Sequence, residues 1–130
     1  MSTISVNMLL NLHYISINMY GGIDGILYEA TLDFIVEKCN QGNGPIQMSA
    51  ILLYDISTMH PFEDGNKRTA VYAATMVLEL YGFSLTADED EVIRMGLALA
   101  RYEMSLEETI LWIQQNSRST DPEPQAPDYT

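Results

Sequence analysis

The stretch HPFEDGNKR, at residues 60–68, determines how the chain folds around it. Proline disfavours helical geometry in the residue before it, so a helix that precedes Pro61 must end near His60. Glu-Asp-Gly at residues 63–65 is typical of a turn, and helical spacing of apolar residues resumes from Asn66. We therefore expect a helix, a turn and a second helix in immediate succession.

Apolar residues recur at helical spacing on both sides of this stretch. Ser5 and Asp88 are suitable N-caps, and Ser105 followed by Glu108 has the spacing of a capping box. Helices are expected over about 5–20, 27–40, 46–59, 66–81, 88–101 and 105–115. The sequence thus predicts an all-α fold, a compact single-domain bundle of about six helices with a short flap.

Two segments are too poor in helix-forming residues to join this bundle. Residues 21–25 read Gly-Gly-Ile-Asp-Gly, which predicts a turn or a short flap. After Asn116 the composition shifts to Ser, Thr, Asp, Pro and Gln, which cannot bury a core. We therefore expect a domain over residues 1–116 and a disordered tail over residues 117–130.

The composition argues against several classes of protein. A net charge of -12 with only six Lys and Arg disfavours binding to the phosphate backbone of nucleic acids. The single cysteine, Cys39, excludes an internal disulfide and any cysteine-rich metal site. The lack of an internal disulfide is typical of proteins in a reducing compartment. No apolar run reaches the roughly 20 residues that span a bilayer, and no basic region precedes an apolar stretch at the N-terminus. We expect a cytoplasmic protein without a membrane partner.

The turn also contains groups suited to phosphate chemistry. The imidazole of His60 can accept a proton from a hydroxyl at neutral pH. Asp64 offers the hard oxygen ligand that Mg²⁺ prefers. Backbone amides at the start of the following helix lack intrahelical acceptors, and Gly65 lets an anion approach them closely. Lys67 and Arg68 sit at that helix start, where cations oppose the helix dipole unless an anion is present.

These residues resemble the motif of the Fic family, commonly written H-P-F-x-[D/E]-G-N-[G/K]-R, at every specified position. The resemblance extends to features of the death-on-curing (Doc) subgroup and covers Met1 to about Asn116. Those features are Tyr-Gly-Gly at residues 20–22, Thr-Ala at residues 69–70 and Tyr-Gly-Phe at residues 81–83. The resemblance implies the helical Fic fold.

The resemblance also implies an enzyme that uses ATP, with Mg²⁺ or Mn²⁺, to modify a hydroxyl group of a protein. In that enzyme His60 would be the general base, Asp64 the metal ligand and Phe62 the buried anchor of the loop. The residues implied in catalysis are His60, Asp64, Asn66 and Arg68. The residues implied in nucleotide binding are Gly65, Asn66, Lys67 and Arg68.

Three positions bear on which group is transferred. AMP-transferring members of the family usually have Gly in place of Lys67 and a second Arg in place of Val71. The Doc toxin of a phage addiction system shares the lysine, and its kind binds ATP reversed, which favours transfer of the γ-phosphate. Gly65 favours the alternative, an AMP transferase, because the phage toxin has Ala there. A second alternative is a catalytically silent nucleotide-binding module, against which His60 and Asp64 argue.

Two kinds of protein partner are implied by the resemblance. A target would dock in an extended conformation at the flap, near Gly21 to Ile26, and a translation factor such as elongation factor Tu is the implied kind of target. Self-inhibited Fic proteins carry the pattern [S/T]-x-x-x-E-[G/N]. The nearest match here runs from Thr75 to Glu79 but is followed by Leu80, so a separate antitoxin is expected.

Residues outside the motif are expected to have structural roles. His13 lies near apolar positions of an amphipathic helix and is expected to pack rather than to catalyse. Glu63 is expected to face solvent. At least partial burial is expected for Tyr14, Tyr20, Tyr54 and Tyr72.

Overall fold

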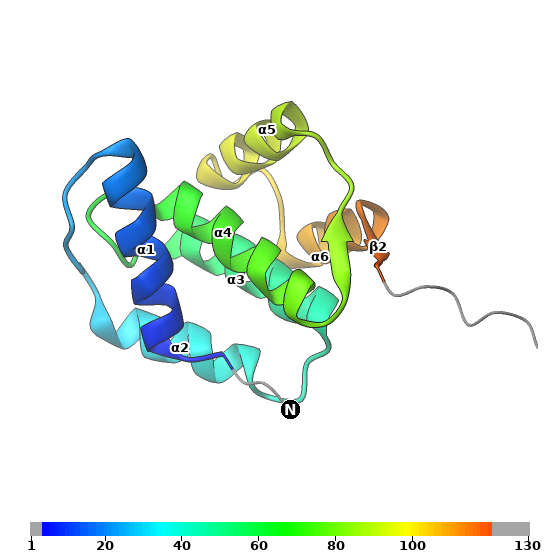
Figure 1. The fold of residues 1–130 in the computed structure, drawn as a ribbon, viewed down its shortest axis with the longest axis horizontal. Helices are drawn as coiled ribbons and strands as arrows, with labels where there is room; N and C mark the ends of the chain where they lie inside the picture. The colour runs from blue at the N-terminus through cyan, green and yellow to red at the C-terminus, as the bar shows by residue number, and fades with distance from the viewer. Residues whose placement is uncertain (1–3, 121–130) are drawn as a thin grey trace, which may run out of the picture.

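The computed structural model describes residues 4–120, and within that range the chain is an all-α domain with one small sheet (Figure 1). The helices are α1 (Val6–Tyr20), α2 (Glu29–Cys39), α3 (Pro45–Met59), α4 (Asn66–Leu80), α5 (Glu89–Ala100) and α6 (Leu106–Gln115). The strands are β1 (Phe83–Leu85) and β2 (Ser117–Ser119). The predicted fold class and the six predicted helices are therefore confirmed. None of these helices is long and apolar enough to cross a bilayer.

The centre of the domain is the pair α3 and α4, which lie side by side with α1 and α2 on one flank and α5 and α6 on the other (Figure 1). α3 is buried over most of its circumference, with Leu52 and Ile56 fully buried. Ala70, Ala73 and Ala74 of α4 are also buried, and their small side chains let the two helices approach closely. The turn that carries the motif joins these two central helices, so it is held by the most buried part of the fold.

Helix ends follow the signals expected from local chemistry. The Ser5 hydroxyl accepts a hydrogen bond from the amide of Met8 at 3.2 Å, and α1 begins directly after Ser5, at Val6. At α6, Ser105 and Glu108 form a complete capping box, with side chain to backbone distances of 3.1 and 3.2 Å. Each cap satisfies amides that have no partner inside the helix. The boundaries of these helices were therefore readable from a few neighbouring residues.

The predicted end of the domain at Asn116 is too early. Residues 117–119, assigned to a disordered tail, form β2 and pair antiparallel with β1 in the register Phe83 to Ser119 and Leu85 to Ser117. This strand is held through backbone hydrogen bonds, which a polar Ser-Arg-Ser sequence permits but does not predict. The part of the tail prediction that concerns residues 121–130 lies outside the described residues.

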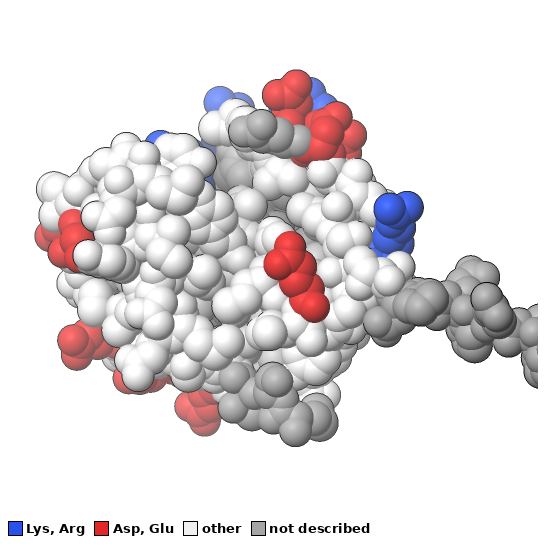
Figure 2. Space-filling model, viewed as in Figure 1, with Lys and Arg blue, Asp and Glu red and all other residues white. Residues whose placement is uncertain are grey.

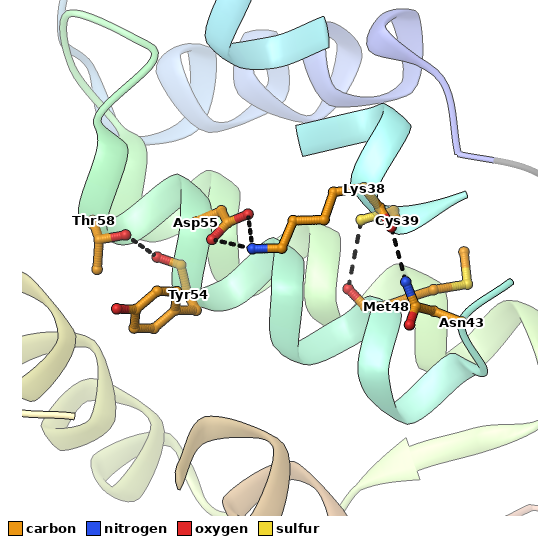
Figure 3. Close-up of polar contacts among 7 residues, drawn as sticks. All are labelled: Lys38, Cys39, Asn43, Met48, Tyr54, Asp55 and Thr58. Atoms are coloured by element: carbon orange, nitrogen blue, oxygen red, sulfur yellow. Dashed lines mark hydrogen bonds and ion pairs between the residues drawn. The ribbon is translucent and has the colours of Figure 1, made fainter. Parts of the chain in front are cut away.

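A buried ion pair joins α2 to α3 (Figure 3). Asp55 of α3 has no exposed surface, and the Nζ atom of Lys38 lies 3.1 and 3.4 Å from its two carboxylate oxygens. Burial raises the pKa of Asp55, and the hydrogen bonds and charge of Lys38 oppose that rise. Burial also raises the pKa of the neighbouring Cys39 thiol to about 12, so this cysteine is a packing group rather than a nucleophile.

Replacing Lys38 by Met is expected to lower the free energy of unfolding at neutral pH by about 3 kcal/mol, because it leaves the Asp55 carboxylate buried without a partner. Urea denaturation measures this loss. Since the folded-state pKa of Asp55 is raised, the neutral carboxyl favours folding at low pH, and this contribution is lost as pH rises through that pKa. The loss in Lys38→Met should therefore shrink at mildly acidic pH.

The matched control for this prediction is Asp55→Asn. It removes the buried charge but keeps an oxygen that can accept a hydrogen bond from Lys38, so it should be far less destabilising than Lys38→Met. Equal losses in the two variants, or a Lys38→Met loss that does not depend on pH, would contradict the argument.

Candidate active site

The motif turn (residues 60–65) lies at an open cavity of about 530 Å³. The cavity is lined by Tyr20, Gly21, Gly22, His60, Glu63, Asp64, Gly65, Asn66, Lys67 and Arg68. The structure therefore brings all six residues that the sequence nominated for catalysis and nucleotide binding to one place, together with the start of the flap. Glu63 also lines the cavity, and its side chain is exposed as expected.

His60 ends α3 in a left-handed conformation, with φ 49° and ψ 61°. Its backbone amide still donates to the carbonyl of Ile56 at 3.3 Å, so His60 is the C-cap residue directly after α3. Its side chain lines the cavity. A residue other than glycine holds this conformation at a cost of about 1–2 kcal/mol. Such strain at a partly exposed residue in a cavity wall is typical of a functional position.

Gly65 begins α4, also in the left-handed region at φ 76°. Glycine adopts this left-handed conformation with little strain because it has no Cβ atom. No side chain caps the first amides of α4 in this structure, so they remain available to an anion in the cavity. The start of α4 thus has the backbone geometry that a phosphate pocket requires, and phosphate binding at these amides stays a prediction.

The side chain of Asn66 has a structural role in the motif turn that the sequence does not predict. Its side-chain oxygen accepts from the amide of Phe62 at 3.0 Å, and its side-chain nitrogen donates to the carbonyl of Phe62 at 2.8 Å. This reciprocal pair closes the motif turn on itself. The role in catalysis and nucleotide binding that the resemblance implies for Asn66 would therefore use a side chain that already holds the loop. Phe62 is fully buried, as expected of the anchor of this loop.

Asp64 connects the motif turn to the flap (residues 21–26). Its exposed carboxylate accepts a hydrogen bond from the amide of Ile23 at 2.8 Å. The backbone of Gly22, with φ 117°, approaches so closely that a Cβ atom there would lie 3.1 Å from the Cβ of Asp64. The carboxylate is therefore held by the flap at the rim of the cavity.

The flap is a non-helical strap laid along the motif turn. Ile26 forms an isolated antiparallel bridge with Phe62, the amide of Leu27 donates to the carbonyl of Pro61 at 2.8 Å, and the amide of Glu63 donates to the carbonyl of Gly25 at 2.9 Å. Ile26 and Leu27 nevertheless keep 40% and 49% of their surface exposed. One edge of the flap thus binds the motif turn while its apolar side chains remain accessible.

Arg68 is supported by Tyr20, an aromatic residue that is more exposed than the sequence predicts. Its guanidinium carbon lies 4.3 Å from the ring centre of Tyr20, a cation–π contact, and Tyr20 also shares a hydrogen bond with Tyr72 that raises the pKa of Tyr72. Tyr20 was expected to be partly buried but is 55% exposed, because it is the last residue of α1 and lines the cavity. Tyr14 is likewise 58% exposed, whereas Tyr54 and Tyr72 are partly buried as expected.

Two cations and two carboxylates, Glu63 and Asp64, line this cavity in an otherwise acidic protein. Lys67 and Arg68 are two of the six basic residues in the chain. α1 (Val6–Tyr20), whose end borders the cavity, contains no Asp or Glu. On the face shown in Figure 2, the surface over α1 is largely uncharged, and acidic side chains lie at the left and lower margins, near the centre of the view and over α5. An anion that approaches past α1 meets no carboxylate from that helix.

The described residues do not contain a dedicated metal cage. Among residues 4–120, no three His, Cys, Asp or Glu side chains come together as ligands. Mg²⁺, however, usually keeps several waters and is bound through one or two carboxylates plus substrate phosphates. Asp64, an exposed carboxylate beside the free amides of α4, fits that mode of binding. The residues present are suited to a metal that arrives with a nucleotide rather than to a resident ion.

The sequence predicts only packing for His13, which does not line the cavity but contacts the motif turn that does. It packs, as expected, with its ring stacked on Phe62 at 3.8 Å between centroids, but its Nε2 atom also lies 2.7 Å from the carbonyl oxygen of Asp64. No signal in the sequence could identify that partner, because the two residues are 51 positions apart.

Comparison with known proteins agrees with this geometry. A model of the Fic/DOC family matches residues 3–78, a range that includes α1, the flap and the whole motif turn. A Fido domain-containing protein of Dictyostelium discoideum is 36% identical over 85 residues, which cover 58% of this chain. The match spans 59% of that relative, somewhat less than two thirds of its length. Since the family model covers more than half of the chain and contains the cavity residues, the chain belongs to the Fic/DOC family.

Proposed function

We propose that the chain is a Fic-type transferase that moves the γ-phosphate of ATP to a Ser or Thr hydroxyl of a protein. One observation carries the proposal: a single cavity combines the imidazole of His60, the carboxylate of Asp64 and the uncapped amides at the start of α4. A base, an anion pocket and a metal ligand are the groups that phosphoryl transfer requires.

The phosphates of ATP would bind at the start of α4. The uncapped amides that follow Gly65 donate to phosphate oxygens, and the helix dipole favours negative charge at this end. Arg68 adds a cation whose position is restricted by its contact with Tyr20. Asp64 would hold Mg²⁺ or Mn²⁺, which when bound neutralises charge on the phosphates.

His60 acts on the target hydroxyl. The hydroxyl oxygen of the target attacks the γ-phosphorus while the imidazole of His60 accepts the hydroxyl proton. A new P–O bond forms, and the bond from the γ-phosphorus to the oxygen that bridges it to the β-phosphorus breaks. ADP leaves with the electron pair of that bond. The left-handed backbone of His60 fixes where its side chain begins at the cavity wall, so the base is positioned before the substrates arrive.

Lys67 favours phosphate over AMP as the transferred group. Its side chain lines the phosphate cavity and also a neighbouring apolar cavity of about 390 Å³, where Val71 stands at the place of a second arginine. Without that guanidinium, the β- and γ-phosphates lack one contact that would hold ATP in the orientation used for AMP transfer. The competing proposal, an AMP transferase, rests on Gly65.

Wild-type protein incubated with ATP and its target is expected to add about 80 Da to the target, the mass of a phosphate, rather than about 329 Da, the mass of AMP. Replacing Lys67 by Gly should reduce phosphate transfer and open the cavity to some AMP transfer, because a long charged side chain is removed. Mass spectrometry of the intact target measures both products.

The control for this experiment is Lys67→Arg, which keeps the charge and much of the length and should retain phosphate as the main product. An AMP adduct from the wild type would reject the kinase proposal in favour of the alternative. Nucleotide binding without transfer to any protein of a bacterial extract would favour the third possibility, a silent nucleotide-binding module.

The same proposal extends to the partners. We propose a toxin of a toxin–antitoxin system that acts in the cytoplasm on a translation factor such as elongation factor Tu. The exposed apolar side chains of the flap suit an extended target segment laid along it. The apolar cavity beside the site suits a segment of a separate antitoxin; it includes Tyr72 and Ile93 and borders Lys67 and Arg68.

A further inference from the structure

His13 lies in the middle of α1, yet its ring contacts both segments that frame the cavity. It is 1% exposed and stacks on Phe62 of the motif turn with an angle of 6° between the rings. Its Nε2 atom is 2.7 Å from the carbonyl oxygen of Asp64, and its Nδ1 atom is 3.4 Å from a carboxylate oxygen of Asp24 in the flap. One side chain therefore lies between the motif turn and the flap. Because a carboxylate can only accept, the contact with Asp24 is attractive when the Nδ1 atom also carries a proton.

The contact with Asp64 has a defined direction. A backbone carbonyl can only accept, so the Nε2 atom of His13 carries the proton and donates it to this hydrogen bond. The peptide between Asp64 and Gly65 is planar, so a donor that holds the carbonyl oxygen also orients the N–H of Gly65, which points to the opposite side. His13 thus sets the orientation of the peptide at which the anion pocket begins.

The surroundings of Gly65 show how closely α1 supports this peptide. A Cβ atom at Gly65 would lie 3.4 Å from both Ile17 and Ser16 and 3.6 Å from His13. Asp64 in turn holds the amide of Ile23 in the flap. A displacement of the Asp64 peptide would therefore be transmitted to the flap as well as to the start of α4.

We propose that His13 is a positioning residue for the transferase site. It acts through other groups: it orients the peptide between Asp64 and Gly65 and keeps the flap against the motif turn. Its effect on catalysis rests on the proposed function, whereas its effect on the flap does not.

Two substitutions separate the hydrogen bond of His13 from its packing. His13→Phe keeps an aromatic ring that can stack on Phe62 but has no donor for the Asp64 carbonyl. His13→Gln keeps an amide donor of similar reach but loses the stacked ring. The phenylalanine variant should be the more stable in thermal unfolding, because a buried ring is better packed than a buried amide with an imperfect partner.

Activity should follow the opposite order. His13→Phe is expected to lower kcat about tenfold to a hundredfold through misplacement of the reacting groups, and His13→Gln should recover part of that loss. A residue with only a structural role would give activities that follow stability. If the phenylalanine variant is as active as the wild type, or if activity follows stability, the proposal is wrong.

Hydrogen exchange tests the same proposal without any activity. In His13→Phe, the amides of Ile23, Leu27 and Glu63 should lose protection, while amides in the middle of α3 keep theirs. Unchanged protection at the flap would reject the positioning role whether or not transfer is seen. Absence of transfer in the wild type would instead reject the proposed function and leave exchange to decide the role of His13.

Asp24→Ala provides a variant that does not disturb the core, because the Asp24 side chain is 56% exposed. It removes one contact of His13 with the flap and leaves the bond to the Asp64 carbonyl. Protection at Ile23 should fall while kcat changes less than in His13→Phe. Should His13→Phe fail to fold, faster exchange at Ile23 in Asp24→Ala supports the link from His13 to the flap, and unchanged exchange rejects it.

Discussion

Replacing His60 by alanine is expected to lower kcat for transfer by about 10²- to 10⁴-fold, the range that a positioned general base contributes. Expression of the variant should no longer arrest bacterial growth if the protein acts as a toxin. Thermal stability should change little, since the side chain is only partly buried and its backbone amide keeps its bond to Ile56. Steady-state kinetics with the purified protein and its target measure the loss.

The left-handed backbone of His60 calls for a second variant. Asparagine tolerates this conformation better than alanine, so His60→Asn should keep the end of α3 intact, yet its amide cannot accept the hydroxyl proton. Both variants should therefore be inactive. If His60→Asn is inactive and His60→Ala retains wild-type kcat, or if both are fully active, His60 is not the base.

Replacing Asp64 is expected to have the second-largest effect. In Asp64→Asn, transfer should fall about a hundredfold, because a metal supplies several kcal/mol of transition-state stabilisation and each 1.4 kcal/mol corresponds to tenfold in rate. The asparagine oxygen can still accept from the amide of Ile23, so the flap should remain in place. The affinity for Mn²⁺ in the presence of a nucleotide, measured by electron paramagnetic resonance, should fall with the rate.

Asp64→Ala separates the metal from the flap. It removes the ligand and the hydrogen bond to Ile23 together, so hydrogen exchange at the flap should increase only in this variant. Transfer that continues unchanged when EDTA removes divalent ions would show that Asp64 is not a metal ligand, and would weaken the proposal of phosphate transfer with it.

The motif turn illustrates what neighbouring residues can specify. Pro61 ends α3 at the residue before His60, and the left-handed glycine at Gly65 starts α4 at Asn66, as expected from the order of residues alone. The candidate site residues could be nominated for the same reason, because the proposed base, carboxylate and anion pocket lie within nine consecutive positions. Local order along the chain brings them to one cavity.

Features that depend on distant residues were not readable in this way. β2 carries a polar sequence whose pairing depends on Phe83 and its neighbours more than thirty positions earlier, so its composition alone predicts a tail. The residue type predicts at least partial burial for Tyr20, but the end of α1 at the cavity leaves its ring 55% exposed, where it supports Arg68. Burial of an amphipathic aromatic side chain is decided by what packs against it.

The sequence by itself determined the six helices, the side-chain caps at Ser5, Asp88 and Ser105, and the nine-residue motif. Capping, proline geometry and helical spacing act over a few bonds. The tertiary structure alone decided that His13 donates to the Asp64 carbonyl and that the amide of Ile23 donates to the Asp64 carboxylate, partners 51 and 41 positions apart. Such contacts depend on how α1 packs against the start of α4 and on the path of the flap between them. Packing of this kind is a property of the folded core as a whole, which no local pattern of residues encodes.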